Sequence, residues 1–153
     1  MEMWIAYAAV VWSVGEIEQG MEKDRRERRD VELHKRLADE QGAVYWGAGW
    51  TRYYNSKPMN GYLYISGEGL VKYRAKVEKI IRKSGHGPQD RKFIPECRKE
   101  WIKEKPTWIK ITEIEELTKP VDPTSMIKWV NHEPIKSARA LQSAVKIVDE
   151  FWE

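Results

Sequence analysis

The chain has 153 residues, of which 33% are charged and one is cysteine, and its mean hydropathy is −0.70. This length predicts a single domain over residues 1–153 with a core of its own. The lone Cys97 excludes an internal disulfide and is typical of a reducing compartment, so we expect a cytoplasmic protein. The apolar run over residues 3–14 is too short to cross a membrane and has no basic leader, so we expect no membrane partner.

Charge is unevenly distributed along a chain whose net charge is only +3. Residues 70–110 contain 13 Lys and Arg against 5 Asp and Glu, a local +8, whereas the remaining residues carry 14 against 19. A basic segment on a near-neutral protein indicates an anionic partner, usually nucleic acid. The alternative is a solvated strand and loop that bind nothing.

The first predicted element is a buried strand over residues 4–11, because nearly every residue there is apolar. Ser13 and Glu16 have the spacing of a capping box and predict a helix over residues 16–41. Residues 22–30 are charged on all sides, which predicts a solvated helix or a mobile loop, although its arginines could contact phosphates. We expect three later apolar residues of this segment to pack in the core: Val31, Leu33 and Leu37.

Three strands are predicted next, over residues 42–50, 61–66 and 70–81. In the third of these strands, apolar and charged residues alternate. The apolar set is Val71, Tyr73, Ala75 and Val77, and the charged set is Lys72, Arg74, Lys76 and Glu78. Such alternation predicts one buried face and one solvated face, with the basic residues on the solvated face.

The C-terminal part predicts a basic connector over residues 93–106, an alternating strand over 107–117 and a short strand over 126–130. Ser137 has the position of a cap for a final helix with an apolar stripe. The stripe consists of Leu141, Ala144, Val145, Val148 and either Phe151 or Trp152. About six strands whose edges need cover predict an α+β fold with a twisted β-barrel and flanking helices.

The segment Gly42–Trp50 is the first candidate for a binding site. Trp46 is followed by Gly47, and a bare backbone beside a large aromatic side chain allows a flat ligand to stack. The alternative is a bulge at the end of a buried strand, with Trp46 as part of the core.

Motifs of common enzyme classes are missing from the sequence. There is no P-loop, and Gly47-Ala48-Gly49 lacks the third glycine of a dinucleotide site. His86 has no second ligand at metal-binding spacing, so we expect neither a metal nor another cofactor. Cys97 has basic neighbours but no histidine close in sequence, which does not favour a catalytic thiol. We therefore expect a binding domain and not an enzyme.

The order of several short motifs resembles the EVE and YTH families, which share the PUA-like barrel. The EVE-like motifs are Trp4-Ile5-Ala6-Tyr7, Val44-Tyr45-Trp46-Gly47, Asn60-Gly61-Tyr62-Leu63-Tyr64-Ile65-Ser66-Gly67 and Val71-Lys72-Tyr73-Arg74-Ala75-Lys76-Val77. The YTH-like motifs are Lys99-Glu100-Trp101-Ile102-Lys103, Thr107-Trp108-Ile109-Lys110-Ile111 and Asn131-His132-Glu133-Pro134-Ile135. Together these motifs cover most of the chain.

The resemblance implies a reader of modified bases, because YTH domains hold N6-methyladenine in an aromatic cage. Trp46 matches the cage tryptophan, with Gly47 offering backbone beside it, and Trp101 matches a second wall. Phe93 and Trp50 are the candidates for a third wall.

The chain departs from both families after its first strand, where they tend to place an asparagine that meets the base edge. Here residues 9–13 leave Ser13 as the only polar side chain, and Trp12 is a further candidate for lining the pocket. The identity of the base is therefore open.

The chain also resembles the N-terminal specificity domain of archaeal McrB-type restriction proteins. That likeness implies recognition of methylated DNA, first of all N6-methyladenine, by base flipping, with GTPase and nuclease supplied by other domains or subunits. The alternative is a PUA-like module that binds modified or structured RNA, and an enzyme acting on a nucleotide or small amide comes last. Phosphate contacts are expected from Lys72, Arg74, Lys76, Arg82, Lys83, Arg91 and Lys92.

Overall fold

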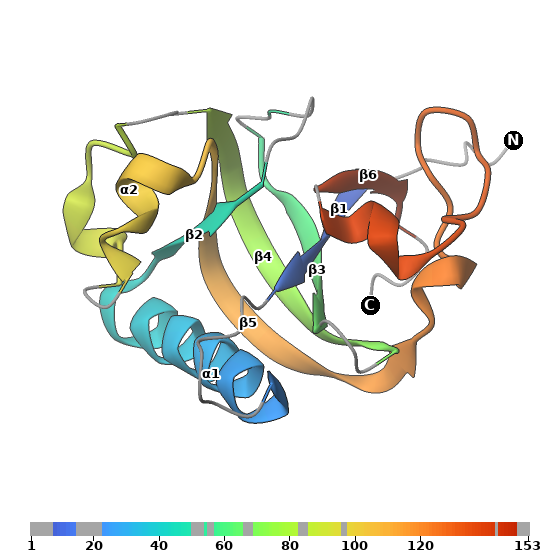
Figure 1. Ribbon diagram of the computed structural model, residues 1–153, viewed down its shortest axis with the longest axis horizontal. Coiled ribbons are helices and arrows are strands. Elements are labelled where there is room, and N and C mark those ends of the chain that lie inside the picture. The colour runs from blue at the N-terminus through green and yellow to red at the C-terminus, as the bar shows by residue number, and fades with distance from the viewer. Residues whose placement is uncertain are drawn as a thin grey trace, which may run out of the picture.

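The computed structural model describes residues 8–14, 23–49, 54, 57–65, 69–82, 86–95, 98–142 and 144–149 (Figure 1). The side chains of residues 8, 13, 14, 23–30, 65, 138 and 142 also lie outside this description. The strands are β1 (Ala8–Val14), β2 (Val44–Ala48), β3 (Met59–Ile65), β4 (Val71–Arg82), β5 (Thr107–Val121) and β6 (Val145–Val148). The α-helices are α1 (Lys23–Gln41) and α2 (Trp101–Glu104), and the 3₁₀ helices are η1 (Arg91–Phe93), η3 (Pro123–Ser125) and η4 (Ala138–Gln142).

The six strands form one mixed sheet in the order β2-β5-β4-β3-β1-β6. β1 runs parallel to β3, and every other neighbouring pair is antiparallel. The long strands β4 and β5 curve side by side across the molecule, and α1 lies against β5 (Figure 1). The α+β class and the six strands are therefore confirmed. The expected closure into a barrel is wrong for the described part of the chain, because no pairing joins the two edge strands, β2 and β6.

β1 confirms the predicted buried strand over residues 8–11, since it lies between β3 and β6 and its residues 9–12 are buried. Residues 4–7 of the prediction lie outside the described part of the chain. The strand continues further than expected, through Trp12 and Ser13 to Val14. Ser13 pairs with Tyr64 in the ladder to β3, so it does not cap a helix. Apolar and β-branched neighbours together with a partner strand outweigh the local capping signal. Residues 15–22 lie outside the described part.

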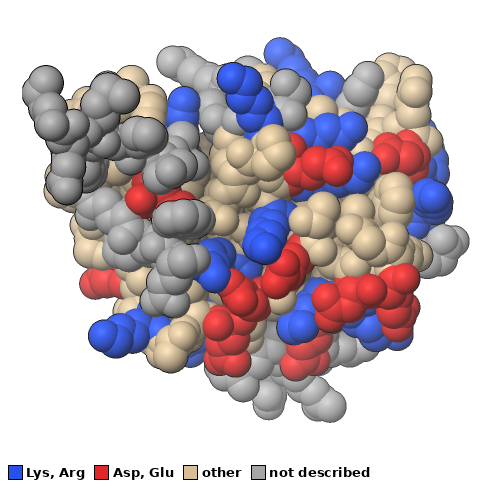
Figure 2. Space-filling view, turned by 180° about the vertical axis from the view of Figure 1, so that it is seen from behind, with Lys and Arg blue, Asp and Glu red and all other residues tan. Residues whose placement is uncertain are grey.

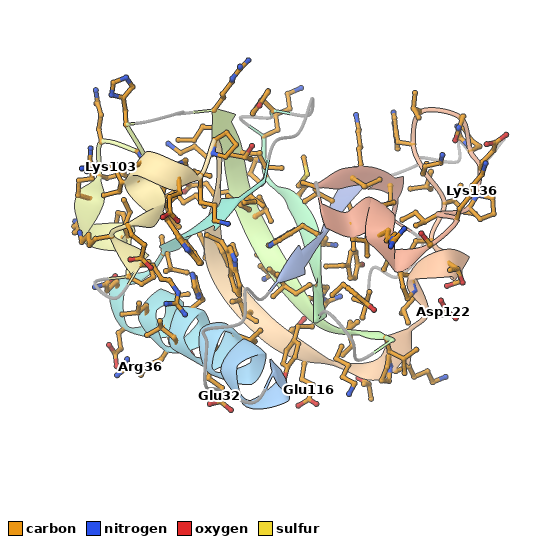
Figure 3. The ribbon with its side chains drawn as sticks, viewed as in Figure 1. Glu32, Arg36, Lys103, Glu116, Asp122 and Lys136 are labelled. Carbon is orange, nitrogen blue, oxygen red and sulfur yellow. The ribbon has the colours of Figure 1, made fainter. Side chains whose placement is uncertain are left out.

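α1 includes the charged run predicted as a solvated helix or a loop, and the structure shows a helix there from Lys23 onward. Glu32 and Arg36 point away from the sheet (Figure 3). Among the described residues, no helix is long and apolar enough to cross a bilayer. The helix ends where Gly42 takes a φ of +86°, and the Gly42 N–H donates to the carbonyl of Ala38 at 2.9 Å.

The buried stripe of α1 differs from the expected one. Val31, His34 and Ala38 are buried, at the i, i+3 and i+7 spacing of one helix face. Leu33 and Leu37, which we expected in the core, are only half-buried on the flanks of this stripe. A histidine therefore takes the central position of the face that packs on the sheet.

β4 confirms the alternation prediction in part. Val71, Ala75 and Val77 are buried and Lys76 is exposed, but the other members of the two sets are half-buried: Tyr73, Lys72, Arg74 and Glu78. β4 pairs with β5 along most of its length, with register shifts near Val77 that allow both strands to curve. The solvated side of β4 therefore lies next to the solvated side of β5.

The C-terminal prediction of a helix is wrong for the described residues, and Phe151 and Trp152 of its apolar stripe lie outside them. Residues 138–142 form η4, and residues 145–148 form β6, which pairs antiparallel with β1. Val145, Ile147 and Val148 are β-branched, and they cover the edge of β1. The short strand expected over 126–130 is reduced to isolated bridges, from Ile127 to Pro134 and from Lys128 to Ile147.

Candidate functional site

The rings of Trp46, His34 and Trp101 stack where α1, β2 and α2 meet. The His34 and Trp46 ring centroids are 3.8 Å apart with 20° between their planes. The His34 and Trp101 centroids are 5.9 Å apart with 22° between the planes. The imidazole therefore joins two indoles that come from distant parts of the sequence.

This stack is nearly closed to solvent. The exposed fraction is 3% for Trp46, 7% for Trp101 and 0% for His34. The structure thus brings together the two indoles that we expected to converge. The space beside Trp46, expected to be open, is filled by the His34 ring.

Gly47 is the point at which Trp101 approaches the main chain of β2. A Cβ at this position would lie 2.9 Å from Cε3 of Trp101 and 2.8 Å from Cγ of Lys105. The bare backbone next to Trp46 is therefore in contact with the second indole, Trp101, which packs against the edge strand β2 at this point.

Two cations lie over the Trp101 ring. The guanidinium carbon of Arg98 is 5.4 Å from the ring centroid, and Nζ of Lys105 is 5.7 Å from it. Arg98 is itself buried. Positive charge over an indole face is favourable, and it also raises the local potential for an anionic ligand.

Phe93, a candidate for the third wall, lies elsewhere. Nζ of Lys110 is 4.9 Å from the Phe93 centroid and 5.7 Å from the Tyr45 centroid, so the two rings share one side of β2. Tyr45 and Trp46 are consecutive in a strand and point to opposite faces. The third ring of the stack is therefore His34 and not Phe93.

Trp12 is a core residue. Its ring packs on Gly61, where a Cβ would lie 2.7 Å from Cζ3 of the indole. Its buried Nε1 has no hydrogen-bond partner within the described part of the chain. The structure does not test two other pocket candidates, because Trp50 and the Ser13 side chain lie outside the described residues.

Two of the basic residues of β4, Arg74 and Lys76, are paired with carboxylates of β5. Arg74 binds Glu115, with Nε 2.8 Å from Oε1, and Nζ of Lys76 is 3.2 Å from Oε2 of Glu113. Figure 2 shows Lys and Arg side chains interleaved with Asp and Glu across the back of the molecule. These cross-strand pairs favour the alternative of an ordinary solvated sheet face at this position.

The remaining candidates for phosphate contacts lie on different elements. Arg82 ends β4, and Lys83 lies outside the described residues. Arg91 and Lys92 are exposed on η1, and Nη2 of Arg91 donates to the carbonyl of His86 at 2.5 Å. Lys103 is exposed on α2, the helix that carries Trp101 (Figure 3).

A polar network holds η1 to the sheet. The Tyr45 hydroxyl donates to Asp90 at 2.9 Å, and Nζ of Lys110 lies 3.3 Å from Asp90 and 3.1 Å from Glu78. Burial, helped by the hydrogen bond to Asp90, raises the pKa of Tyr45 well above its ordinary value. Burial alone would raise the pKa of Asp90, but the hydrogen bonds from Tyr45 and Lys110 lower it by more. Burial lowers the pKa of Lys110, whereas Glu78 and Asp90 raise it by more.

A second polar cluster joins β3 to the end of β6. The Asp149 carboxylate accepts from the Tyr62 hydroxyl at 2.6 Å and from Nδ2 of Asn60 at 2.8 Å. β1 lies between these strands, and the small Ala9 pairs with Asn60 on one side and Ile147 on the other. The arrangement is a clamp that fixes the edge strand. No three His, Cys, Asp or Glu residues within the described ranges gather as metal ligands would.

His34 is the site residue that sequence reasoning missed. Its signal is present in the sequence, because Val31, His34 and Ala38 share one helix face. The partner rings, however, come from β2 and α2, and no local pattern links them to α1.

No protein-family model, curated protein or solved structure matches this chain. The geometry of the site is therefore the basis for a function.

Proposed function

We propose that this chain binds nucleic acid that carries a modified base, most simply DNA with N6-methyladenine, and that the flipped base stacks on Trp46 and Trp101. The observation that supports this proposal is the ring stack. Two indoles from separate elements hold a flat nitrogen heteroaromatic ring, the imidazole of His34, which belongs to the same chemical class as a nucleobase.

The energetics fit such a ligand. Flipping a base out of a duplex costs a few kcal/mol. Stacking on an aromatic side chain returns about 1–3 kcal/mol per base. A methyl group on the exocyclic nitrogen adds apolar area, which burial rewards at roughly 25 cal/mol per Å². Modified bases should therefore bind more tightly than unmodified ones in this pocket.

Exposed cations of η1 and α2 supply contacts to the phosphate backbone. Arg91 and Lys92 on η1 and Lys103 on α2 belong to the segment that also carries Trp101. The ion-paired residues of β4 contribute less, because their charges are already balanced by β5. Binding through these groups should weaken with salt and be independent of methylation.

The likeness to McrB-type specificity domains extends this proposal to a cellular role. In that role the chain is the recognition module of a modification-dependent restriction system in the cytoplasm. It binds and does not catalyse, and GTP hydrolysis and DNA cleavage belong to other domains or subunits.

The proposal is tested by measuring dissociation constants for duplexes with and without N6-methyladenine, and for single-stranded RNA. Trp46→Ala and Trp101→Ala should each weaken binding of the modified duplex at least tenfold. Trp129→Ala is the matched control, because Trp129 packs under Lys146 of β6, at the opposite edge of the sheet from β2. The proposal fails if both variants fold cooperatively and bind the modified duplex as tightly as the unaltered protein.

A further inference from the structure

His34 is a buried polar side chain for which the proposed function has as yet no role. It stands at a helix position whose neighbours along the same face are Val31 and Ala38. Between these two apolar residues, the helix face holds a flat heteroaromatic ring that is in contact with two indoles.

We infer that His34 is a displaceable occupant of the base-binding position, so that the imidazole and a purine or pyrimidine base exclude each other from the faces of Trp46 and Trp101. The inference rests on the proposed function for the identity of the ligand. The exclusion itself follows from geometry. A centroid separation of 3.8 Å is a van der Waals contact, so no second ring can enter between His34 and Trp46.

The free protein is therefore autoinhibited. A ligand binds only the conformations in which the ring has left, and its apparent affinity falls by the fraction of molecules that are open. If about one molecule in ten is open, removal of the ring should tighten binding about tenfold. The penalty is the same for every base, so the ratio of affinities for methylated and unmethylated DNA should stay unchanged.

Two variants at position 34 distinguish removal of the ring from its replacement by a ring that stays in place. His34→Ala removes the imidazole from the two indoles, so free N6-methyladenosine or imidazole should bind there more tightly and raise the melting temperature of this variant by more than that of the unaltered protein. His34→Phe keeps a flat ring in place, and its apolar ring gains more from burial, so it should weaken binding of the duplex. The matched control is His86→Ala, because His86 is exposed and should leave both measurements unchanged.

A measurement on the unaltered protein tests the inference even if the variants do not fold. Ring currents of the two indoles should shift the NMR signals of the His34 ring protons, and saturation with the methylated duplex should return them toward the values of an exposed histidine. The inference is overturned if the duplex binds while these signals stay in place, or if His34→Ala folds and gains no affinity for any of the ring compounds. If His34→Ala takes up free N6-methyladenosine but neither protein binds the duplex, the inference stands and the proposed function fails.

Discussion

Trp101 rests on the main chain of Gly47, and its Cε3 atom would lie 2.9 Å from any Cβ placed there. This contact couples α2 to the edge strand β2, because a larger residue would force the ring away. It also fixes the distance between the Trp101 and Trp46 rings, since Trp46 precedes Gly47 in the same strand.

Gly47→Ala should therefore destabilise the fold by about 1–3 kcal/mol, the range for an overpacked buried site. Urea denaturation followed by tryptophan fluorescence measures this change, and the free-state fluorescence should change as Trp101 shifts. Thr118→Ala, on the exposed part of β5, is the control and should remain within about 0.5 kcal/mol. An unchanged urea midpoint for Gly47→Ala would show that Trp101 does not depend on this contact.

The elements that the sequence predicted well are those with a local signal. The alternation over Val71–Arg82 locates β4 because each side chain follows from its own neighbours. The strand Val145–Val148 was predicted as a helix because its apolar residues fit a helical stripe equally well. Only its pairing with β1, which is far away in sequence, decides between the two forms.

The site residues also differ in whether a local signal predicts them. Trp46 and Trp101 could be named from their sequence context, and the structure brings both onto His34. His34 itself was not predicted, because its role depends on the packing of α1 against β2. The ion pair between Arg74 and Glu115 was not predicted for a similar reason. Glu115 belongs to the neighbouring strand β5, and the sequence of β4 alone does not show which residues of β5 lie opposite.

The clamp of Asp149 on β3 should contribute to the stability of the sheet edge. Tyr62→Phe removes one donor and leaves a buried carboxylate less well satisfied, so it should cost about 1–3 kcal/mol. Chemical denaturation measures the loss. Amide hydrogen exchange should show that β6 opens more readily than β4, because the clamp acts at the edge strand. Equal acceleration of exchange in both strands would contradict a local clamp.

Alkaline pH should destabilise the protein through Tyr45. Its pKa is raised in the folded state, so above its ordinary value of 10.0 the unfolded chain loses the proton first. The stabilising contribution is complete below pH 10 and is lost as pH rises through the folded pKa. Lys110, with a pKa raised above 10.5, acts in the same direction.

Tyr45→Phe should therefore lower the free energy of unfolding at pH 7 but flatten its decline between pH 9 and about 11. Thermal unfolding across this pH range measures the slope. Tyr64→Phe controls for the loss of a phenol elsewhere in the sheet. Parallel pH profiles for Tyr45→Phe and the unaltered protein would show that this hydroxyl does not govern the alkaline transition.

The salt dependence of DNA binding should locate the interface on the segment that includes η1 and α2. Each Lys or Arg that contacts a phosphate contributes about 0.9 to the slope of log K against log salt. Arg91→Ala, Lys92→Ala and Lys103→Ala should each reduce that slope by about one and weaken methylated and unmethylated duplexes equally. Lys76→Ala is the contrasting variant, because Lys76 pairs with Glu113 on the face of β4 and β5. A slope that responds to Lys76→Ala and not to the three other variants would place the nucleic acid on the sheet face, away from the ring stack.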